Sequence, residues 1–356
     1  MKKIKLAVLF GGVSSEHEVS LLSVTSILKN IHSEKYELLL VGITKDGRWL
    51  RYAGDIDHIA SGAWESDPSC TPAILSPDRS QHGFLIHRED RWETVPVDCV
   101  FPVLHGKNGE DGSMQGFFTV AGIPFVGCGV LASACCMDKD VTHTMLKQAG
   151  IRTADWRTIR KPEFEKQEEK ILLSLEEAFD YPMFVKPANA GSSVGITKAK
   201  DRASLKSGLK LAFLHDGKAV VEKTITGMEV ETAVLGNGET AVAEVGQIIP
   251  GKEFYDYEDK YLSDQSQTRI PADLDQPIRD EIRETAARAY RLLGCEGFCR
   301  VDFFVTEQKE IILNEPNTIP GFTAISMYPK LWEHCGLSYG DLIDRLVTLA
   351  LERTDQ

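Results

Sequence analysis

The first 130 residues alternate between short apolar runs and segments with helical spacing, and this alternation restricts the fold more than any other feature. Buried strands are expected at KLAVLFGG (5–12), YELLLVGIT (36–44) and VDCVFPVL (97–104). EVSLLSVTSILKNI (18–31) has the apolar spacing of an amphipathic helix, and another helix is predicted from about Ser113. The pattern predicts an α/β protein whose first unit is a parallel sheet with crossover helices.

The stretch between the second and third of these strands does not follow that alternation. Residues 53–82 are rich in Gly, Ser, Asp and Pro, and we expect them to form loops. FLIHREDRWETVPV (84–97) has the alternation of an exposed hairpin. Together they predict an insertion in the parallel unit, and the sequence indicates no role for it.

Two further units are predicted, so that the chain divides into residues 1–130, 131–225 and 226–356. A length of 356 residues is ample for such a division. In the central unit we expect a helix over 138–149 and strands at 183–188 and 219–224. In the third unit we expect strands over 229–237, 240–249, 297–306 and 310–317, and helices over 275–293, 324–334 and 338–352.

The composition narrows the possible partners and the compartment. A formal net charge of −13 argues against nucleic acid and anionic membranes as partners. No run approaches the roughly 20 apolar residues of a membrane span. The eight cysteines lack the spacing of a disulfide framework, and Cys295 and Cys299 have no second pair with which to bind zinc. We therefore expect a small-molecule protein of the cytoplasm.

Four polar residues interrupt two apolar strands near the C-terminus. Arg300 and Asp302 alternate with an apolar residue, and Glu315 and Asn317 do the same on the next predicted strand, so each pair shares a face. If the strands pair, the oxygen donors Asp302, Glu315 and Asn317 meet, and such donors suit Mg²⁺ held against phosphates. The alternative is a solvated strand face with a surface Arg–Asp pair. The apolar flanks favour the metal site, because carboxylates among them are costly without a cation.

Basic residues and glycine loops predict where an anion would bind. Taken alone, Lys139 and Lys260 resemble solvated surface lysines. Lys186 differs because it ends a buried strand, where an ammonium is costly without an anion. KPANAGSSVGI (186–196) has the glycines and serines of a phosphate loop, but its lysine precedes them, unlike a P-loop. Carboxylates at Glu222 and Glu229 could accept from ribose hydroxyls, although a plain turn explains them equally well.

Two further loops follow strands of the first unit. Gly11 to Glu16 follows the first strand, and HGKNGEDG (105–112) follows the last. Glycines and a helix start at the carboxyl end of a strand provide an anion or small-molecule site. The two loops together predict a crevice at this end of the sheet.

Taken in order, these motifs resemble the D-alanine–D-alanine ligase family of the ATP-grasp superfamily. The resemblance runs from about residue 4 to 350, and it is carried by GG…E, HGKNGEDG, MDK, VKPANAGSSVGI, VEK…GME, FYDYEDKY, CRVDF and NEPNTIPGFT. It implies an N-terminal domain followed by a two-part ATP-grasp fold, with an insertion over 53–95 that longer bacterial members share. It also implies that the Gly/Ser loop is a lid over the ATP phosphates, which Lys186 reaches from its strand.

The resemblance implies that ATP phosphorylates the first D-alanine and that the amine of the second attacks the acylphosphate. Phosphoryl transfer requires cations around the phosphates. The implied ATP ligands are Lys139, Lys186, Ser193, Glu222, Lys223, Glu229 and Lys260. The implied metal ligands Asp302, Glu315 and Asn317 would hold two Mg²⁺, for which Mn²⁺ could substitute, and a monovalent cation is left open. Arg300 would bind substrate and, with the backbone N–H of Gly321, stabilise the oxyanion.

The resemblance also implies a substrate site. Glu16 would receive the ammonium of the first D-alanine, with His105 near its carboxylate. Ser326, with Met327 beside it, would bind the second D-alanine. Hydrogen bonds from Ser192 and Tyr261 to Glu16 would close two loops over the site and exclude water.

Three alternatives are weighed against this interpretation. Ala324 and Ile325 differ from common members, so a D-Ala–D-Ser ligase of the vancomycin-resistance type is the second hypothesis. Tyr261 is the residue expected for an amine nucleophile rather than for D-lactate. A regulator with an inactive ATP-grasp fold predicts a missing ligand, and none is missing. A carboxylase-type enzyme lacks the HGKNGEDG and KY motifs. A homodimer through the N-terminal domain is implied as well.

Overall fold

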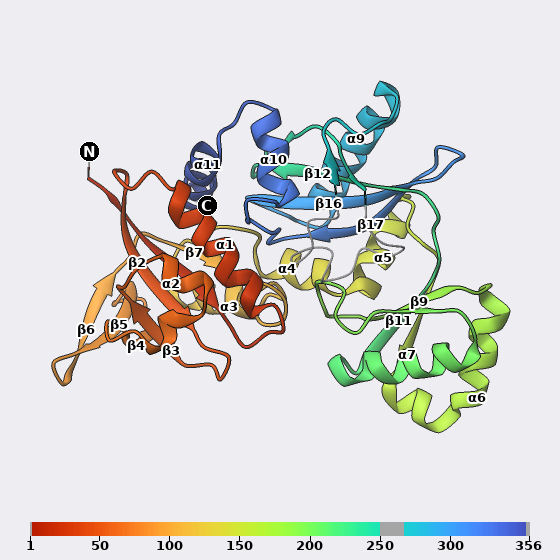
Figure 1. Ribbon diagram of the computed structural model, residues 1–356, viewed down its shortest axis with the longest axis horizontal. Helices are drawn as coiled ribbons and strands as arrows, with labels where there is room; N and C mark the ends of the chain where they lie inside the picture. The colour runs from red at the N-terminus through yellow and green to blue at the C-terminus, as the bar shows by residue number, and fades with distance from the viewer. Residues whose placement is uncertain (1, 250–266, 354–356) are drawn as a thin grey trace.

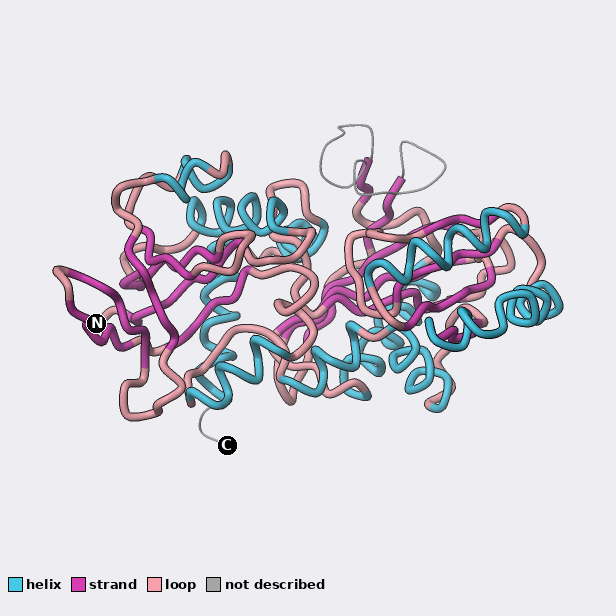
Figure 2. Tube along the Cα trace, turned by 90° about the horizontal axis from the view of Figure 1, so that it is seen from below, coloured by secondary structure: helices cyan, strands magenta, loops and turns pink. Residues whose placement is uncertain are grey.

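The computed structural model describes residues 2–249 and 267–353. Three sheets follow one another along the chain, and Figure 1 shows the N-terminal sheet at one side and helices α6 and α7 at the other. Figure 2, turned by 90°, keeps the N-terminal strands and the helices of the central unit at opposite ends of the long axis. None of the described helices is long and apolar enough to cross a membrane.

The first sheet contains the predicted parallel core. Strand β1 pairs in parallel with both β2 and β7, which confirms the predicted parallel arrangement for these three strands. The crossover from β1 to β2 is helix α1, whose buried face covers the sheet. The bounds are β1 Ile4–Gly11, α1 His17–Asn30, β2 Tyr36–Ile43, β7 Cys99–Val103 and α3 Ser113–Ala121.

The insertion extends this sheet by antiparallel pairing, in the order β6-β5-β4-β3-β2-β1-β7. Its elements are β3 Trp49–Tyr52, α2 Asp57–Ala60, η1 Ala63–Ser66, β4 Thr71–Leu75, β5 Gly83–Arg88 and β6 Arg91–Pro96. The hairpin is confirmed by the pairing of β5 with β6, but its predicted exposure is wrong for β5, where Phe84 and Ile86 are fully buried. The prediction of loops over 53–82 is wrong for α2, η1 and β4. Ile59, Trp64 and Leu75 are at most 1% exposed, so burial against the rest of the unit outweighs the loop-like composition.

The connection between β6 and β7 shows that the sheet curls. These strands form opposite edges in the hydrogen-bonding order, yet only Val97 and Asp98 separate them in the chain. Asp98 N donates to Lys5 O at 2.8 Å, which places the junction beside the start of β1. The curled sheet encloses an apolar core that includes Ala7, Leu9 and Ile86.

The central unit is an antiparallel sheet in the order β10-β9-β11-β8, with two helices on one face. Val185 and Val221 face the core with α6 and α7, so Lys186 and Glu222, one residue further on, face the other side. The bounds are α4 Val130–Met137, α5 Lys139–Gln148, β8 Trp156–Arg160, α6 Lys161–Ala178, β9 Met183–Pro187, β10 Thr197–Ala199, α7 Arg202–His215 and β11 Lys218–Lys223.

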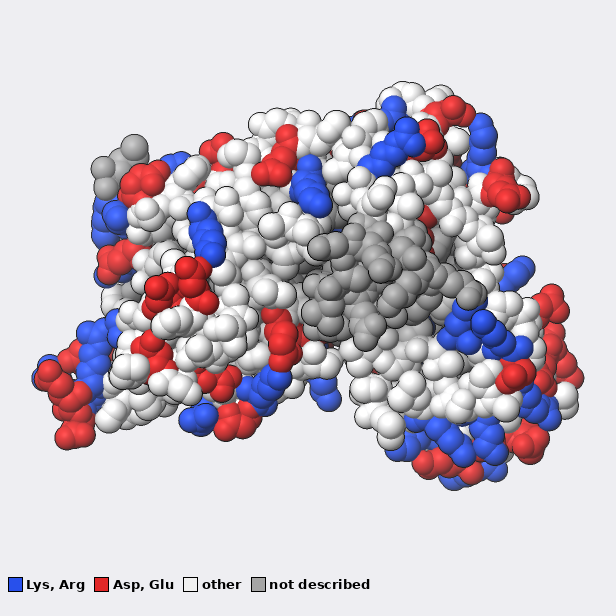
Figure 3. Space-filling model, viewed as in Figure 1, with Lys and Arg blue, Asp and Glu red and all other residues white. Residues whose placement is uncertain are grey.

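The outer surface of this lobe carries charges of both signs. Figure 3 shows basic and acidic side chains next to one another over α6 and α7. Ion pairs account for part of this pattern, such as Lys206 with Glu168 at 2.5 Å. Exposed pairs of this kind contribute little stability, so the surface is best understood as solvated.

The third sheet is antiparallel, in the order β15-β14-β12-β16-β17, and it joins the other two units. Val301 and Phe303 of β16 are buried with α9, so Arg300 and Asp302 face the opposite side. The bounds are β12 Met228–Leu235, β13 Ala241–Val242, β14 Gly246–Ile249, β15 Gln267–Arg269, α9 Gln276–Leu292, β16 Phe298–Val305, β17 Ile311–Asn317, α10 Met327–His334 and α11 Tyr339–Glu352.

Four buried thiols gather where α4 meets β16. Cys295 interacts with Cys128, Cys136 and Cys299, and the Cys136 and Cys295 Sγ atoms are 3.8 Å apart. Hydrogen bonding to Cys295 and burial raise the pKa of the Cys136 thiol. The fold thus brings Cys295 and Cys299 together with Cys128 and Cys136, which are distant from them in the sequence. Among the described residues, however, no three of these sulfur atoms lie within 4.8 Å of one another, so the thiols pack as core residues.

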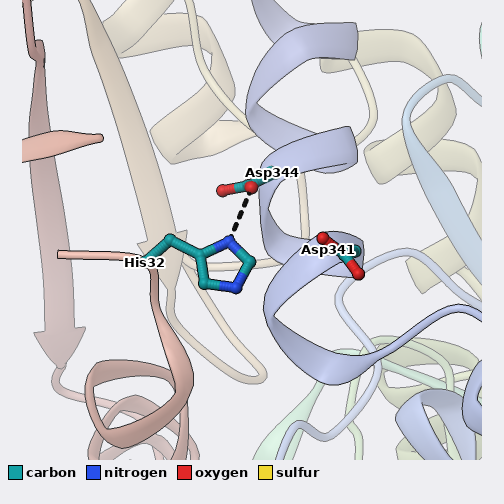
Figure 4. A group of neighbouring side chains, drawn as sticks. All are labelled: His32, Asp341 and Asp344. Carbon is teal, nitrogen blue, oxygen red and sulfur yellow. Dashed lines mark hydrogen bonds and ion pairs between the residues drawn. The ribbon is translucent and has the colours of Figure 1, made fainter. Parts of the chain in front are cut away.

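Asp344 of α11 connects the C-terminal helix to the N-terminal unit. Its carboxylate accepts from Tyr36 at 2.6 Å, from His32 at 2.8 Å and from Lys35. Figure 4 shows His32 directed at Asp344, with Asp341 nearby. In residues 2–249 and 267–353 this is the one group of three His, Cys, Asp or Glu side chains with metal-ligand spacing. Because the Lys35 ammonium contacts the same oxygen, the group is an ion-pair network.

Candidate active site

The four polar residues predicted on β16 and β17 lie together. Asp302 is opposite Glu315 and Arg300 is opposite Asn317 in the strand register. Asn317 Nδ2 donates to Asp302 Oδ2 at 3.0 Å, and Arg300 donates to both Asp302 oxygens at 2.7 and 2.8 Å. The arrangement places three oxygen-donor side chains and one guanidinium on a single sheet face.

Glu231 of β12 joins this group, and the sequence analysis missed it. It lies opposite Asp302 in the register, is 8% exposed, and its Oε2 is 3.0 Å from Arg300 Nε. Period-two alternation could have found it, because Glu231 is two residues beyond Glu229 on the same strand. Arg300 is therefore held between two carboxylates.

Lys139 links the start of α5 to the Gly/Ser loop. Its ammonium donates to Ala190 O at 2.7 Å and lies 4.0 Å from Glu315 Oε2. Asp138 caps the helix by accepting from Val141 N at 3.2 Å, which fixes where the helix begins. The cap therefore positions a lysine between the acidic face and the loop.

Lys186 lies in a buried triad with Glu222 and His143. Lys186 Nζ is 2.7 Å from Glu222 Oε2, and His143 Nε2 is 3.0 Å from Glu222 Oε1. Burial alone would raise the pKa of Glu222, but attraction to Lys186 and the hydrogen bond to His143 lower it to about 2. Burial would lower the pKa of Lys186, but Glu222 and Glu315 raise it overall. The triad therefore keeps an ammonium charged inside the protein.

Both carboxylate oxygens of Glu222 already have protein partners, and the ribose contact expected of this side chain, which would use a further lone pair, stays a prediction. Glu229, half-buried on β12, keeps that expectation as a prediction. Lys223 is exposed at the end of β11. His143 was missed because a lone histidine on a helix carries no signal until the fold sets it beside Glu222.

The Gly/Ser loop reaches across to the N-terminal unit. Ser192 Oγ donates to Glu16 Oε1, and Ser192 and Ser193 both have positive φ values, of 46° and 61°. A Cβ on Gly191 would lie 2.8 Å from Glu16 Oε2, and a Cβ on Gly106 would lie 2.2 Å from the same atom. A side chain at either position would displace the Glu16 carboxylate, and Gly106 also has a positive φ of 72°, which favours glycine there.

Glu110 is a half-buried carboxylate near Glu16, and the sequence analysis did not single it out within HGKNGEDG. It accepts from Gly106 N at 2.6 Å and from Ile319 N at 3.3 Å. Burial and then the charge of Glu16 raise its pKa well above the ordinary value. Glu110 therefore connects the loop after β7 to the loop after β17.

His105 lies in the same region and is 5% exposed. Its Nε2 is 3.1 Å from Ser23 Oγ of α1, and burial lowers its pKa to about 4. The imidazole is therefore neutral at physiological pH. Ser23 also lies 3.5 Å from Phe322 N, so it links His105 to the loop after β17.

That loop contains Gly321 and Ser326. Ser326 Oγ accepts from Thr323 N at 3.0 Å, and a Cβ on Gly321 would lie 2.9 Å from it. Met327, at the start of α10, is 4% exposed, and its side chain packs against Gly246 in the core. A substrate contact by the Met327 side chain is thus not supported, which leaves its backbone N–H as the available group.

Comparisons with known proteins identify the family of the chain. Family models described as D-ala D-ala ligase N-terminus and C-terminus match residues 5–128 and 145–348. The chain belongs to the D-alanine–D-alanine ligase family. A D-alanine–D-alanine ligase of Caldicellulosiruptor bescii is 47% identical, covering 100% of this chain and 97% of that protein. D-alanine–D-alanine ligase B of Clostridium tetani is 49% identical, covering 99% and 94%.

Solved structures of the ligase family confirm the predicted fold class. The VanG D-Ala:D-Ser ligase of Enterococcus faecalis superimposes with a TM-score of 0.88 at 43% identity, covering 98% of this chain and 100% of that chain. The D-alanine–D-alanine ligase of Coxiella burnetii gives 0.86 at 34% identity, covering 100% and 96%. The N-terminal domain with a parallel core, followed by antiparallel sheets of ATP-grasp type, is thus the fold of this ligase family.

Two predicted ligase residues, Lys260 and Tyr261, lie outside the described residues. Their roles stay predictions. The relation to the two ligases that are 47% and 49% identical favours D-alanine over the D-serine alternative, whose named relative is 43% identical.

Proposed function

We propose that this chain joins two D-alanines into D-alanyl-D-alanine, with ATP consumed through a D-alanyl phosphate, to supply peptidoglycan precursor. One observation carries the proposal: the hydrogen bond from Ser192 to Glu16. It joins the Gly/Ser loop to the N-terminal domain, and the same loop accepts a hydrogen bond from Lys139 at Ala190 O. Lys139 and Lys186 both interact with Glu315, so the cations cluster at the acidic face. A ligase that forms an acylphosphate needs this combination of clustered cations and a loop that excludes water.

Lys139 and Lys186 are the proposed ligands of the ATP phosphates. Lys186 is already held in place by Glu222, so it loses little conformational freedom when a phosphate binds. Glu222 also keeps the ammonium charged, because it helps to raise the pKa of Lys186. Lys223, Glu229 and Ser193 are proposed to complete the nucleotide contacts, with Lys260 as a further phosphate ligand.

The acidic face of β16 and β17 fits magnesium. Asp302, Glu315 and Asn317 supply oxygen donors from adjacent strand positions, and hard divalent cations prefer such donors. When bound there, two Mg²⁺ would neutralise phosphate charge, and Mn²⁺ shares the same ligand preference. Arg300 balances part of the carboxylate charge on this face.

The N-terminal domain provides the site for the first D-alanine. Glu16 is proposed to pair with the ammonium of the first D-alanine. His105, which is neutral, is proposed to donate a hydrogen bond to the substrate carboxylate. Arg300 and the Gly321 N–H would stabilise the oxyanion on the reacting carbon. Ser326 and the backbone N–H of Met327 would bind the carboxylate of the second D-alanine.

The reaction balances with these groups. A carboxylate oxygen of the first D-alanine attacks the γ-phosphorus, and ADP leaves. The amine of the second D-alanine then attacks the acyl carbon and loses a proton, and inorganic phosphate leaves as the peptide bond forms. Water must be excluded between the two steps, and Ser192, with Tyr261 as the proposed second member, closes the site.

A homodimer through the N-terminal domain and a cytoplasmic location are proposed as well, since ATP and amino acids are cytoplasmic substrates. Equilibrium sedimentation would test the dimer.

The decisive experiment follows phosphate release from ATP with D-alanine, D-serine, D-lactate or L-alanine as substrate, together with mass analysis of the product. We expect D-alanyl-D-alanine as the main product and a large loss of turnover in Asp302→Asn. A higher kcat/KM for D-serine as the second substrate would instead support a D-Ala–D-Ser ligase. ATP consumption independent of any amino acid would contradict both.

A further inference from the structure

A cavity lies in the N-terminal domain at the end of the sheet away from the active site. It has a volume of about 410 Å³. Residues 37–40 of the parallel core line one side, and residues 51–54 and 95–97 of the insertion line the other. The insertion, for which the sequence indicates no role, therefore builds one side of a half-open cavity.

Three cationic side chains line this cavity, against one carboxylate. Lys5, Arg51 and Arg88 are the cations, and Glu37 is the acid. Within the described parts of the chain, neither Lys5 nor Arg51 has a side-chain ion pair. Arg88 has only a distant one, to Glu93 at 3.9 Å. In a chain with a net charge of −13, such a local excess of positive charge is distinctive.

Strand alternation explains why these cations point inward. Lys5 shares a face of β1 with Ala7 and Leu9, which are fully buried in the core of the curled sheet. Arg88 shares a face of β5 with Ile86. Arg51 lies opposite Val41, another residue of the same core. All three therefore lie on the inner face at the mouth of the curled sheet, where Lys5 and Arg51 are half-buried and Arg88 is exposed.

This placement has an electrostatic cost. Burial, followed by the charge of Arg88, lowers the pKa of Arg51, so the two guanidinium groups are close enough to repel. No protein carboxylate pairs with Arg51 among residues 2–249 and 267–353. An anion between the side chains would offset both the burial and the repulsion.

We propose that this cavity binds a small anion with at least two negative charges, of the phosphate-ester or polycarboxylate class. Arg51 and Arg88 would hold it through their planar guanidinium groups, whose donors match two oxygens of one anion, and Lys5 would add a third charge. The volume is within the range of small-molecule sites. The site takes no part in the ligase reaction.

The position of the cavity supports this separation. Lys5 is near the start of β1, whereas Gly11 ends the strand and leads to Glu16. Six residues of strand correspond to about 20 Å. Binding in the cavity and binding at Glu16 can therefore be measured independently in one molecule.

The test is a titration of the full chain with inorganic phosphate and, separately, with citrate, followed by backbone amide signals in NMR spectra. We expect saturable shifts at residues 37–40 and 53–56, with an affinity on the order of 1 mM or tighter, for at least one probe. The probe that binds distinguishes a phosphate site from a carboxylate site. Phosphate also enters the active site, so signals from residues 105–112 are followed separately.

Variants decide whether the arginine holds the anion. Arg51→Gln should weaken binding about tenfold, and Lys5→Gln should do the same if Arg51→Gln alters the fold. Arg48→Gln removes an exposed arginine of the same domain, which pairs with Asp46 outside the cavity, and should leave the affinity unchanged. Absent or non-saturating shifts for both probes, or equal affinities in Arg51→Gln and Arg48→Gln, would overturn the proposal.

Discussion

Two glutamates on opposite sides of the active site, Glu222 buried and Glu110 half-buried, have opposite pKa shifts. Glu222, on the ATP side, is ionised and paired with Lys186 and His143, and its pKa falls to about 2. Glu110, on the D-alanine side, has backbone N–H partners and the like charge of Glu16 nearby, and its pKa rises. Burial acts in the same direction on both, so the neighbouring charges decide the outcome.

The difference assigns separate tasks to the two sides. The ATP side keeps a fixed charge pair ready for phosphates, whereas the D-alanine side holds loops together through a carboxyl group that resists ionisation. Substitutions that remove charge while keeping shape should therefore be harmful at Glu222 and tolerated at Glu110.

The largest effect is expected for Glu222→Gln. Glutamine keeps the shape but leaves the Lys186 ammonium buried without its partner, so stability should fall by about 3–5 kcal/mol at pH 7. The Glu222 pKa is lowered on folding, so its contribution is full above pH 4.5, the ordinary value, and is lost as the pH falls towards 2. The difference in unfolding free energy between the wild type and Glu222→Gln should therefore become smaller as the pH falls from 4.5 towards 2.

Urea unfolding at several pH values measures this effect. Glu165→Gln, at an exposed position on α6, is the matched control and should change stability by no more than about 0.5 kcal/mol. Equal unfolding free energies for Glu222→Gln and this control would show that the triad is not a stabilising charge pair.

A smaller effect is expected when only the third member of that triad is removed. His143→Phe leaves the buried Glu222 one hydrogen bond short, a loss of about 1.5–3 kcal/mol. Because Lys186 is positioned through Glu222, we expect the KM for ATP to rise more than kcat falls. His143→Gln, which can place an amide donor near the same oxygen, should restore most of the affinity. A purely packing role predicts no rescue by glutamine.

How far the sequence could predict the site depends on the distance between the contributing residues. Asp302 and Glu315 were placed correctly because strand alternation and a short connection bring them together. Glu231 was missed although its alternation with Glu229 was visible in the sequence. His143 was missed because only the fold sets this helical residue beside Glu222. The raised pKa of Glu110 could not be predicted from the sequence, because it depends on how close the fold brings the loop of Glu110 to Glu16. The buried element around Trp64 was missed because composition gives no information on what covers it.

Glu110 tests the other side of the comparison. Glu110→Ala removes the acceptor of two backbone N–H groups and should lower the free energy of unfolding by about 1–3 kcal/mol. Glu110→Gln keeps an acceptor, so it should lower the free energy of unfolding by less. The pKa of Glu110 is raised on folding, so wild-type stability should fall as the pH rises above 4.5, by up to about 1.4 kcal/mol per unit. Glu110→Gln should lack that component. If the unfolding free energies of the wild type and Glu110→Gln changed equally with pH, the raised pKa of Glu110 would be contradicted.

The smallest effect on stability, and the most specific one on chemistry, is expected for Ser192→Ala. Ser192 is half-buried on a loop, so losing its hydrogen bond to Glu16 should lower the free energy of unfolding by about 0.5–1.5 kcal/mol at most. The bond is nevertheless proposed to close the loop over a D-alanyl phosphate that water would hydrolyse. The variant should therefore release more phosphate than dipeptide, and its kcat/KM for D-alanine should fall about tenfold, which corresponds to 1.4 kcal/mol. Ser193→Ala, next along the loop, removes no bond to Glu16 and should affect the KM for ATP while keeping one phosphate per dipeptide. Measuring both products in one assay separates the two serines, and an unchanged ratio in Ser192→Ala would mean that the contact with Glu16 does not exclude water.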